Sequence, residues 1–247
     1  MKELIFSGVI HPERAQVSIT EITQYLDDID GNNLGTLKIE ISVSQITAHL
    51  STEREDIDLF TWKNSLQPRI EVLVDSFGFL VGCGYEVEII KAYDVKAKKD
   101  HVYGVNIETL PSCTSKEELL KKYALLSSLF KGMEGGYLQR CLADLRQAIR
   151  NPFDSSLHCF RAVESIRQIY CYRNSIDPEK QRPKSWQILR EDLGVDESLI
   201  QNNIQRYAKV IRHGGLSQFT QEERTQMLGT TWDIMHKYIE KYGKNNF

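Results

Sequence analysis

Hydrophobic and polar residues alternate in several short runs of the first half of the chain, which is the pattern of half-buried β-strands. The clearest run covers residues 37–44, where four aliphatic residues alternate with lysine, glutamate and serine residues. Further strands are predicted at residues 4–10, 16–25, 85–93 and 102–110. Together these runs predict a β-sheet in the first half of the chain.

One long helix is predicted among these strands. Apolar residues recur at helical spacing from Leu59 to Phe77, after the acidic stretch 53–58, which suits a helix N-terminus. Pro68 lies inside this pattern, and proline interrupts helices because it lacks an amide hydrogen and clashes with the preceding turn. We therefore expect a kink or a split at this position. The predicted fold of residues 1–112 is a β-rich sheet domain with one long helix.

The pattern changes at the stretch 110–115, after which only helical periodicity is found. Ser115 and Glu118 have the spacing of a capping box, so we place the domain boundary between residues 112 and 113. Five or six amphipathic helices are predicted, with apolar positions within 119–130, 138–149, 157–170, 186–193, 200–211 and 227–239. Residues 113–247 are thus expected to form an all-α helical bundle, which makes the whole chain α+β.

Glycine and aspartate residues mark the expected ends of these helices. Gly132, Gly135 and Gly136 are expected to stop the first helix, and Asp154 is expected to cap the third. Gly214 follows the helix that ends near residue 213, where a left-handed residue commonly terminates a helix.

That late helix carries two residues that could form a functional site. Arg206 and His213 are seven positions apart, so they lie two turns apart on one helix face. The stripe formed by Ile200, Ile204 and Ile211 occupies the opposite face, so the cation and the imidazole are expected to point away from the core. A solvated polar face, as on any surface helix, is the alternative interpretation.

Composition places the chain among ordinary globular proteins, with 41% hydrophobic and 26% charged residues. We predict a cytoplasmic protein without membrane contact, because the sequence shows neither a signal sequence nor a membrane-spanning stretch. The five cysteines are scattered and none forms a Cys-x-x-Cys pair, so we expect reduced thiols in or near the core.

Charge is distributed unevenly between the two halves. Residues 1–115 hold 10 Lys or Arg against 18 Asp or Glu, whereas residues 116–247 hold 21 against 16. The second half is therefore basic and the first acidic, so a polyanion is expected to bind the second half.

The first half offers two acidic pairs, Asp28/Asp30 and Asp56/Asp58, that could hold a divalent metal, as in nucleotidyltransferases. That chemistry also needs a Gly-Ser phosphate-binding turn shortly before the pair, which the sequence lacks. We interpret both pairs as solvated turns and predict no metal and no cofactor.

The helical half resembles the HEPN superfamily, all-α domains of bacterial defence and toxin–antitoxin proteins. The resemblance rests on Arg206 and His213 with six intervening residues near the end of a late helix, on the trailing Gly214-Gly215, and on the long earlier helix HCFRAVESIRQIY. It covers about 110 residues, from Tyr137 to the C-terminus. Many catalytic members have a polar residue directly after the arginine, where this chain has Tyr207.

The resemblance implies a metal-independent endoribonuclease in which Arg206 and His213 are catalytic. RNA carries its own nucleophile, the 2′-hydroxyl, so cleavage needs a proton-transfer group and a cation that stabilises charge on the phosphate. Arg212, Lys209 and Glu164 are auxiliary candidates, with a solvated cation or a surface ion-pair partner as the alternative for each. His158 is a further residue that could face the site.

The resemblance also implies a homodimer, because members pair two such helices to build a composite cleft. We therefore expect RNA, a second copy of the chain and an antitoxin or defence protein as partners, with the acidic half in a regulatory or trigger-sensing role. The alternative is a non-catalytic HEPN-like module that binds RNA or protein.

Overall fold

The computed structural model describes residues 1–27, 33–104, 107, 109–215 and 219–243, and the chain divides into two compact units. These are Met1–Gly104 and Val105–Phe247, and each has a hydrophobic core of its own. The first is a sheet with one long helix and the second is helical, so the predicted α+β class is confirmed.

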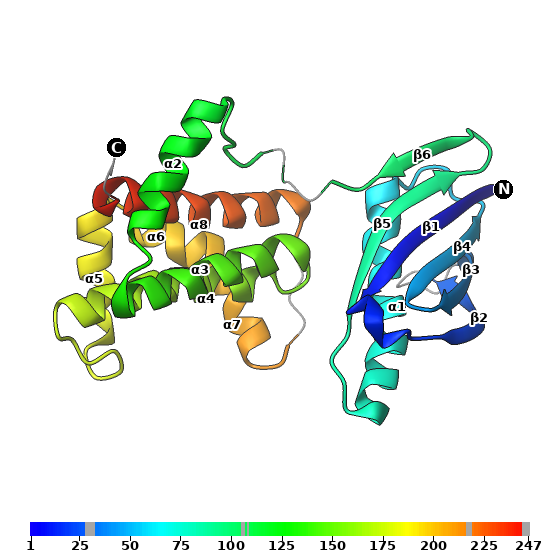
Figure 1. Cartoon of the computed structure of the whole chain (residues 1–247), viewed down its shortest axis with the longest axis horizontal. Helices are drawn as coiled ribbons and strands as arrows, with labels where there is room; N and C mark the ends of the chain where they lie inside the picture. Colours follow the sequence, from blue (N-terminus) through cyan, green and yellow to red (C-terminus); the bar gives the residue numbers. More distant parts are fainter. Residues whose placement is uncertain (28–32, 105–106, 108, 216–218, 244–247) are drawn as a thin grey trace. The chain divides into compact units, whose positions relative to one another are not determined.

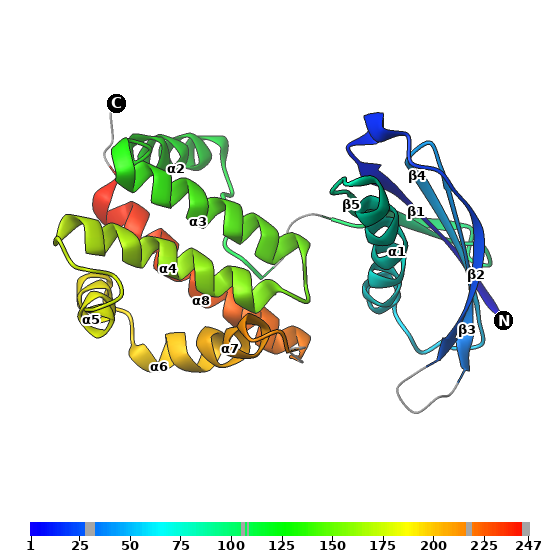
Figure 2. The ribbon, with the colours of Figure 1, turned by 90° about the horizontal axis from the view of Figure 1, so that it is seen from below.

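The first unit is a six-stranded antiparallel sheet with the strand order β2-β3-β4-β1-β5-β6. The strands are β1 Lys2–His11, β2 Ile19–Asp27, β3 Asn33–Ser42, β4 Gln45–Thr52, β5 Glu86–Asp94 and β6 Lys99–Val102. A short 3-10 turn, η1 Glu13–Ala15, follows β1. The sheet curls around the helix α1 Leu59–Val81, which covers one of its faces (Figure 1 and Figure 2).

The long helix continues through Pro68, so the expected split at the proline is wrong. Asp58 caps its N-terminus by accepting hydrogen bonds from the N–H groups of Phe60 and Thr61 at 2.8 and 2.9 Å. One side of the helix, from Trp62 to Gly78, is buried against the sheet. This burial along the whole face offsets the loss of one helical hydrogen bond at the proline.

Strand β4 has no counterpart among the predicted strands. It follows β3 through the two-residue turn Val43-Ser44, whose φ angles of 49° and 64° are unusual for residues other than glycine. Contacts from the loop before β2 support the turn, since Ser44 Oγ accepts from the Val17 N–H and Ser18 Oγ accepts from the Val43 N–H, both at 3.0 Å. The turn lacks the Asn-Gly or Asp-Gly signal, so local sequence gives no sign of it.

The end of the sheet also differs from prediction. Strand β6 is a short hairpin partner of β5 and ends at Val102, whereas the sequence predicts a strand over residues 102–110, of which 105, 106 and 108 lie outside the described residues. The division between the units accordingly falls after Gly104, ahead of the expected boundary at residue 112. Leu110 packs in the core of the helical unit.

The helical unit is built around one central helix. Its elements are α2 Lys116–Ser128, α3 Gly132–Arg150, α4 Ser155–Arg173, α5 Arg182–Leu193, α6 Glu197–Ile200, η2 Gln201–Gln205, α7 Arg206–Arg212 and α8 Gln221–Tyr242. Helix α4 packs against α3, α5, α7 and α8, and most of its residues are buried (Figure 2). None of the described helices is both long and apolar enough to cross a membrane.

Two of the expected helix ends are wrong in detail. Gly135 and Gly136 lie inside α3, and a Cβ at Gly135 would come within 2.6 Å of the backbone of Phe130, so close packing explains that glycine. Asp154 precedes α4 but makes no side-chain cap bond; its carboxylate accepts from Asn151 Nδ2 at 3.1 Å. Ser115 does cap α2, accepting from the Glu118 N–H at 3.1 Å.

We predict that fragments 1–104 and 105–247 fold independently, because each holds a complete hydrophobic core. Each purified fragment is expected to unfold in a single cooperative transition in thermal circular dichroism. A fragment that shows no such transition would contradict the independence of the two units.

Candidate functional site

The segment from Glu197 to Arg212 forms one continuous helical rod. Asp196 caps its start by accepting from the Ser198 N–H at 2.8 Å. Its end has the expected left-handed cap: Gly214 has φ 79°, and its N–H bonds the Ile211 carbonyl at 2.9 Å. The Gly215 N–H bonds the Val210 carbonyl at 3.0 Å, which completes a Schellman motif and fixes His213 as the last residue of the helix.

The middle of this rod, Gln201–Gln205, is a π-helical turn. The N–H of Arg206 bonds the carbonyl of Gln201, five residues back. Such widened turns are rare and recur at functional sites, because the wider turn changes which way the flanking side chains point. Gln201 and Gln205 both line the pocket described below.

Arg206 and His213 are both exposed, on the side away from the buried Ile204 and Ala208. Their environments nevertheless differ. Arg206 Nη2 lies 3.2 Å from Glu223 Oε1 and also contacts the Tyr207 hydroxyl, while its guanidinium carbon lies 4.4 Å from the centre of the Tyr207 ring. Arg206 is thus held against the N-terminus of α8.

Glu223 is the centre of this cluster. The Tyr207 hydroxyl and the backbone N–H of Thr220 both donate to its carboxylate, which keeps the pKa of Glu223 below its usual range. Burial of its ring, and then the hydrogen bond to Glu223, raise the pKa of Tyr207. The carboxylate is therefore charged near neutral pH and holds Arg206 by an ion pair.

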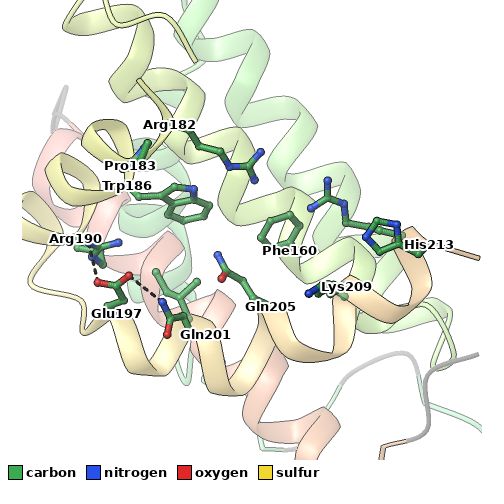
Figure 3. Close-up of a pocket in the computed structure, with 13 residues that line it drawn as sticks. Phe160, Arg182, Pro183, Trp186, Arg190, Glu197, Gln201, Gln205, Lys209 and His213 are labelled. Atoms are coloured by element: carbon green, nitrogen blue, oxygen red, sulfur yellow. Dashed lines mark hydrogen bonds and ion pairs between the residues drawn. The ribbon is translucent and has the colours of Figure 1, made fainter. Parts of the chain in front are cut away.

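A pocket of about 490 Å³ opens beside the rod (Figure 3). Its residues come from α4, α5, α6, the π turn and the end of α7. Its apolar lining consists of Phe160, Pro183, Trp186, Ile200 and Ala208. Phe160 and Trp186 stack with their ring centres 6.3 Å apart, and their exposed fractions are only 3% and 7%. These two rings form the apolar floor of the pocket.

The charged residues of the pocket fall into two groups. Arg190 pairs with Glu197 at 3.0 Å, and Arg182 pairs with Glu164. The other group is Lys209, Arg212 and His213, which have no carboxylate partner in the described part of the chain. Arg212 lies over the Phe160 ring, 5.3 Å from its centre, which leaves the edge of its guanidinium free to bind an anion.

The pocket thus gathers His213 with the auxiliary candidates Arg212 and Lys209, but Arg206 does not line it. Glu164 does not line it either; its carboxylate holds Arg182 and lies 3.8 Å from the buried Arg167. His158 faces elsewhere, with Nδ1 3.3 Å from Asp144 Oδ1 between α3 and α4.

Of the two acidic pairs of the first unit, Asp56/Asp58 lies in the described residues, and each of its members has a protein partner. Asp56 pairs with Arg54 at 2.8 Å, and Asp58 caps α1. Asp28 and Asp30 lie outside the described residues. Across the described ranges, groups of three or more potential metal ligands are absent.

The cysteines only partly follow the prediction. Cys141, Cys159 and Cys171 are buried, and burial raises the pKa of Cys159 to about 12. Cys83 is exposed instead, just after α1.

Sequence reasoning missed most of the pocket. Trp186 is one of the apolar positions predicted for the helix at residues 186–193, and the pocket combines it with residues of α4 and of the rod Glu197–Arg212. The one local signal is the pair Gln201 and Gln205, polar residues four apart that flank the isoleucine stripe, and even these depend on the π turn for their direction.

Both halves of the chain match models of one family. Residues 4–103 match the N-terminal domain, and residues 124–242 the C-terminal domain, of the family described as Domain of unknown function (DUF8168). The two matches lie within the two compact units and occur in the same order. No curated protein and no solved structure matches the chain.

The exposure of Arg206 and His213 predicts how substitutions affect stability. Ile204→Ala removes a side chain with no exposed surface and is expected to lower the free energy of unfolding by about 2–5 kcal/mol. Arg206→Ala and His213→Ala are expected to change it by about 0.5 kcal/mol or less, as for surface positions. Urea denaturation measures all three, and a loss in either polar variant as large as that of Ile204→Ala would assign that residue a structural role.

Proposed function

We propose that this chain, whose two halves match the two DUF8168 domains, uses its helical unit as a metal-independent endoribonuclease of the HEPN type. The observation that carries the proposal is the cluster of Lys209, Arg212 and His213 at the edge of the pocket. Two cations without carboxylate partners in the described residues stand beside an imidazole, a side chain that can serve as a proton-transfer group. RNA phosphate is the ligand that this combination suits.

The reaction uses the ribose 2′-hydroxyl of the RNA as nucleophile. His213 accepts the hydroxyl proton as the oxygen forms a bond to phosphorus. The bond from phosphorus to the 5′-oxygen breaks, and this oxygen takes up a proton from a second acid or from water. The products are a 2′,3′-cyclic phosphate and a 5′-hydroxyl, while Lys209 and Arg212 stabilise the charge that develops on the phosphate.

Arg206 contributes to the reaction by exchanging its ion-pair partner, Glu223, for a phosphate of the RNA. Its ion pair with Glu223 is exposed to solvent, so a phosphate can replace the carboxylate at low cost. Seven helical residues place the Cα atoms of Arg206 and His213 about 10 Å apart, a span that their two side chains can bridge toward one phosphate. A bidentate Arg206–phosphate contact would then add to the charge stabilisation.

One observation favours a second function, an RNA-binding or protein-binding module without cleavage. Arg206, the first residue of the motif, is held by Tyr207 and Glu223 rather than directed into the pocket. If this contact persists with RNA bound, the cations of the pocket still bind phosphate, but the arginine contributes nothing to catalysis.

The active form of the protein is a homodimer. A single histidine can supply one proton-transfer group, and a second copy of the chain would bring the other to a composite cleft. The acidic sheet unit then regulates the site or senses a trigger. The protein acts in the cytoplasm and has an antitoxin or defence protein as its partner.

We expect purified protein to cleave single-stranded RNA in the presence of EDTA. His213→Ala is expected to reduce the cleavage rate by a hundredfold or more, since a positioned proton-transfer group contributes about that much. Arg206→Ala is expected to reduce it to a similar extent. Gel electrophoresis of labelled RNA measures the rates.

His49→Ala and Arg146→Ala are matched controls, because both residues are exposed and lie outside the pocket. Folded His213→Ala and Arg206→Ala proteins that cleave like wild type would remove the ribonuclease proposal. Binding without cleavage by the wild type would establish the second function.

A composite cleft also predicts a homodimer whose two-fold axis lies at or beside the Arg206/His213 face. Multi-angle light scattering of the full chain at micromolar concentration is expected to give twice the mass of the chain. A stable monomer that still cleaves RNA would show that one copy holds the complete site.

A further inference from the structure

The pocket beside α7 has two chemically different ends. At one end, beside His213, Lys209 and Arg212 add positive charge that no carboxylate of the described residues neutralises. At the other end, Arg190 and Glu197 neutralise each other, and Gln201 Nε2 donates to Glu197 Oε1 at 2.9 Å (Figure 3). The pocket is therefore matched to a ligand with one anionic end and one neutral, hydrogen-bonding end.

Gln205 lies between these two ends. Its side chain comes from the π-helical turn and points into the cavity between Trp186 and Phe160 (Figure 3). The amide makes no hydrogen bond to any described residue, so its donor and its acceptor are both available to a ligand. The apolar floor formed by Phe160 and Trp186 supports a planar group at this depth.

We infer that the pocket binds one nucleotide of the RNA, with its phosphate at Lys209, Arg212 and His213 and its base against Gln205. This inference rests on the proposed function and names the part of the substrate that the site reads. The pocket volume of about 490 Å³ lies within the usual range of small-ligand sites, about 300–1,000 Å³. Glu197 neutralises Arg190, whereas Arg182 contacts Glu164, whose carboxylate also lies 3.8 Å from Arg167.

The preferred base is adenine. A glutamine amide presents one donor and one acceptor side by side, and it pairs with adenine through the base's amino group and an adjacent ring nitrogen. Adenine offers such a donor–acceptor pair on both its Watson–Crick and its N7 edge, so it matches Gln205 in two orientations, whereas cytosine offers one on its Watson–Crick edge alone. Adenine also carries no carbonyl oxygen that the apolar lining would leave without a partner.

The test measures binding of two hexanucleotides, rA6 and rC6, with 2′-fluoro groups that remove the attacking hydroxyl and prevent cleavage. Fluorescence anisotropy of the full chain in EDTA gives the affinities. Wild-type protein is expected to bind the adenine oligomer about fivefold more tightly or better, the lower limit for one bidentate base contact. Gln205→Leu is expected to bring the affinity for rA6 down to that for rC6.

The phosphate end is tested by salt dependence. Lys209→Ala and Arg212→Ala are expected to weaken both oligomers equally, and each should reduce the slope of log affinity against log salt by about 0.7. Gln226→Ala and Lys121→Ala are matched controls, since both residues are exposed, lie on α8 and α2 and do not line the pocket.

The outcomes separate this inference from the function on which it rests. Equal binding of rA6 and rC6, or a preference for rA6 that survives Gln205→Leu, overturns the base-reading pocket but leaves the ribonuclease proposal to its own test. Absence of binding to either oligomer overturns both. A Gln205-dependent preference for rA6 supports the pocket whether or not the protein cleaves RNA.

Discussion

The packing of α4 is the constraint on which the helical unit depends. This helix is buried by α3, α5, α7 and α8, so each of these neighbours takes its position from a face of α4. Phe160 on α4 shows the consequence for the site, because it stacks on Trp186 of α5 and supports Arg212 at the end of α7. Three elements that are separate in sequence are thereby joined at one floor, and the pocket exists because α4 holds them there.

The helical rod that faces Phe160 and Trp186 has well-defined caps at both ends and a π-helical turn in its middle. The cap at Asp196 and the Schellman motif at Gly214 fix the two ends of the rod, and the π turn lies between them. The π turn directs Gln205 into the pocket, whereas Arg206 lies outside the pocket lining and contacts Glu223. The arginine and the histidine of the motif therefore share an exposed face but occupy different surroundings.

Charge within the site follows a simple division of roles. Carboxylates contact the two arginines of α5 that line the pocket, Arg182 and Arg190, which stabilises the wall of the pocket. The end of α7 keeps its positive charge, so an anionic ligand is drawn to one end only. Such an arrangement orients a nucleotide as well as binding it, which is what both RNA cleavage and selective RNA recognition require.

The sequence by itself determined the α+β class, most helices and strands, the exposure of Arg206 and His213, and the cap at Gly214. These features follow from local periodicity, which records only which side of an element is buried. Tertiary structure decided the rest. The Val43-Ser44 turn depends on contacts from the segment before β2, and α1 passes Pro68 because its buried face packs on the sheet. The pocket joins residues from four helices and a π turn, and no local pattern encodes such a meeting because it arises from long-range packing.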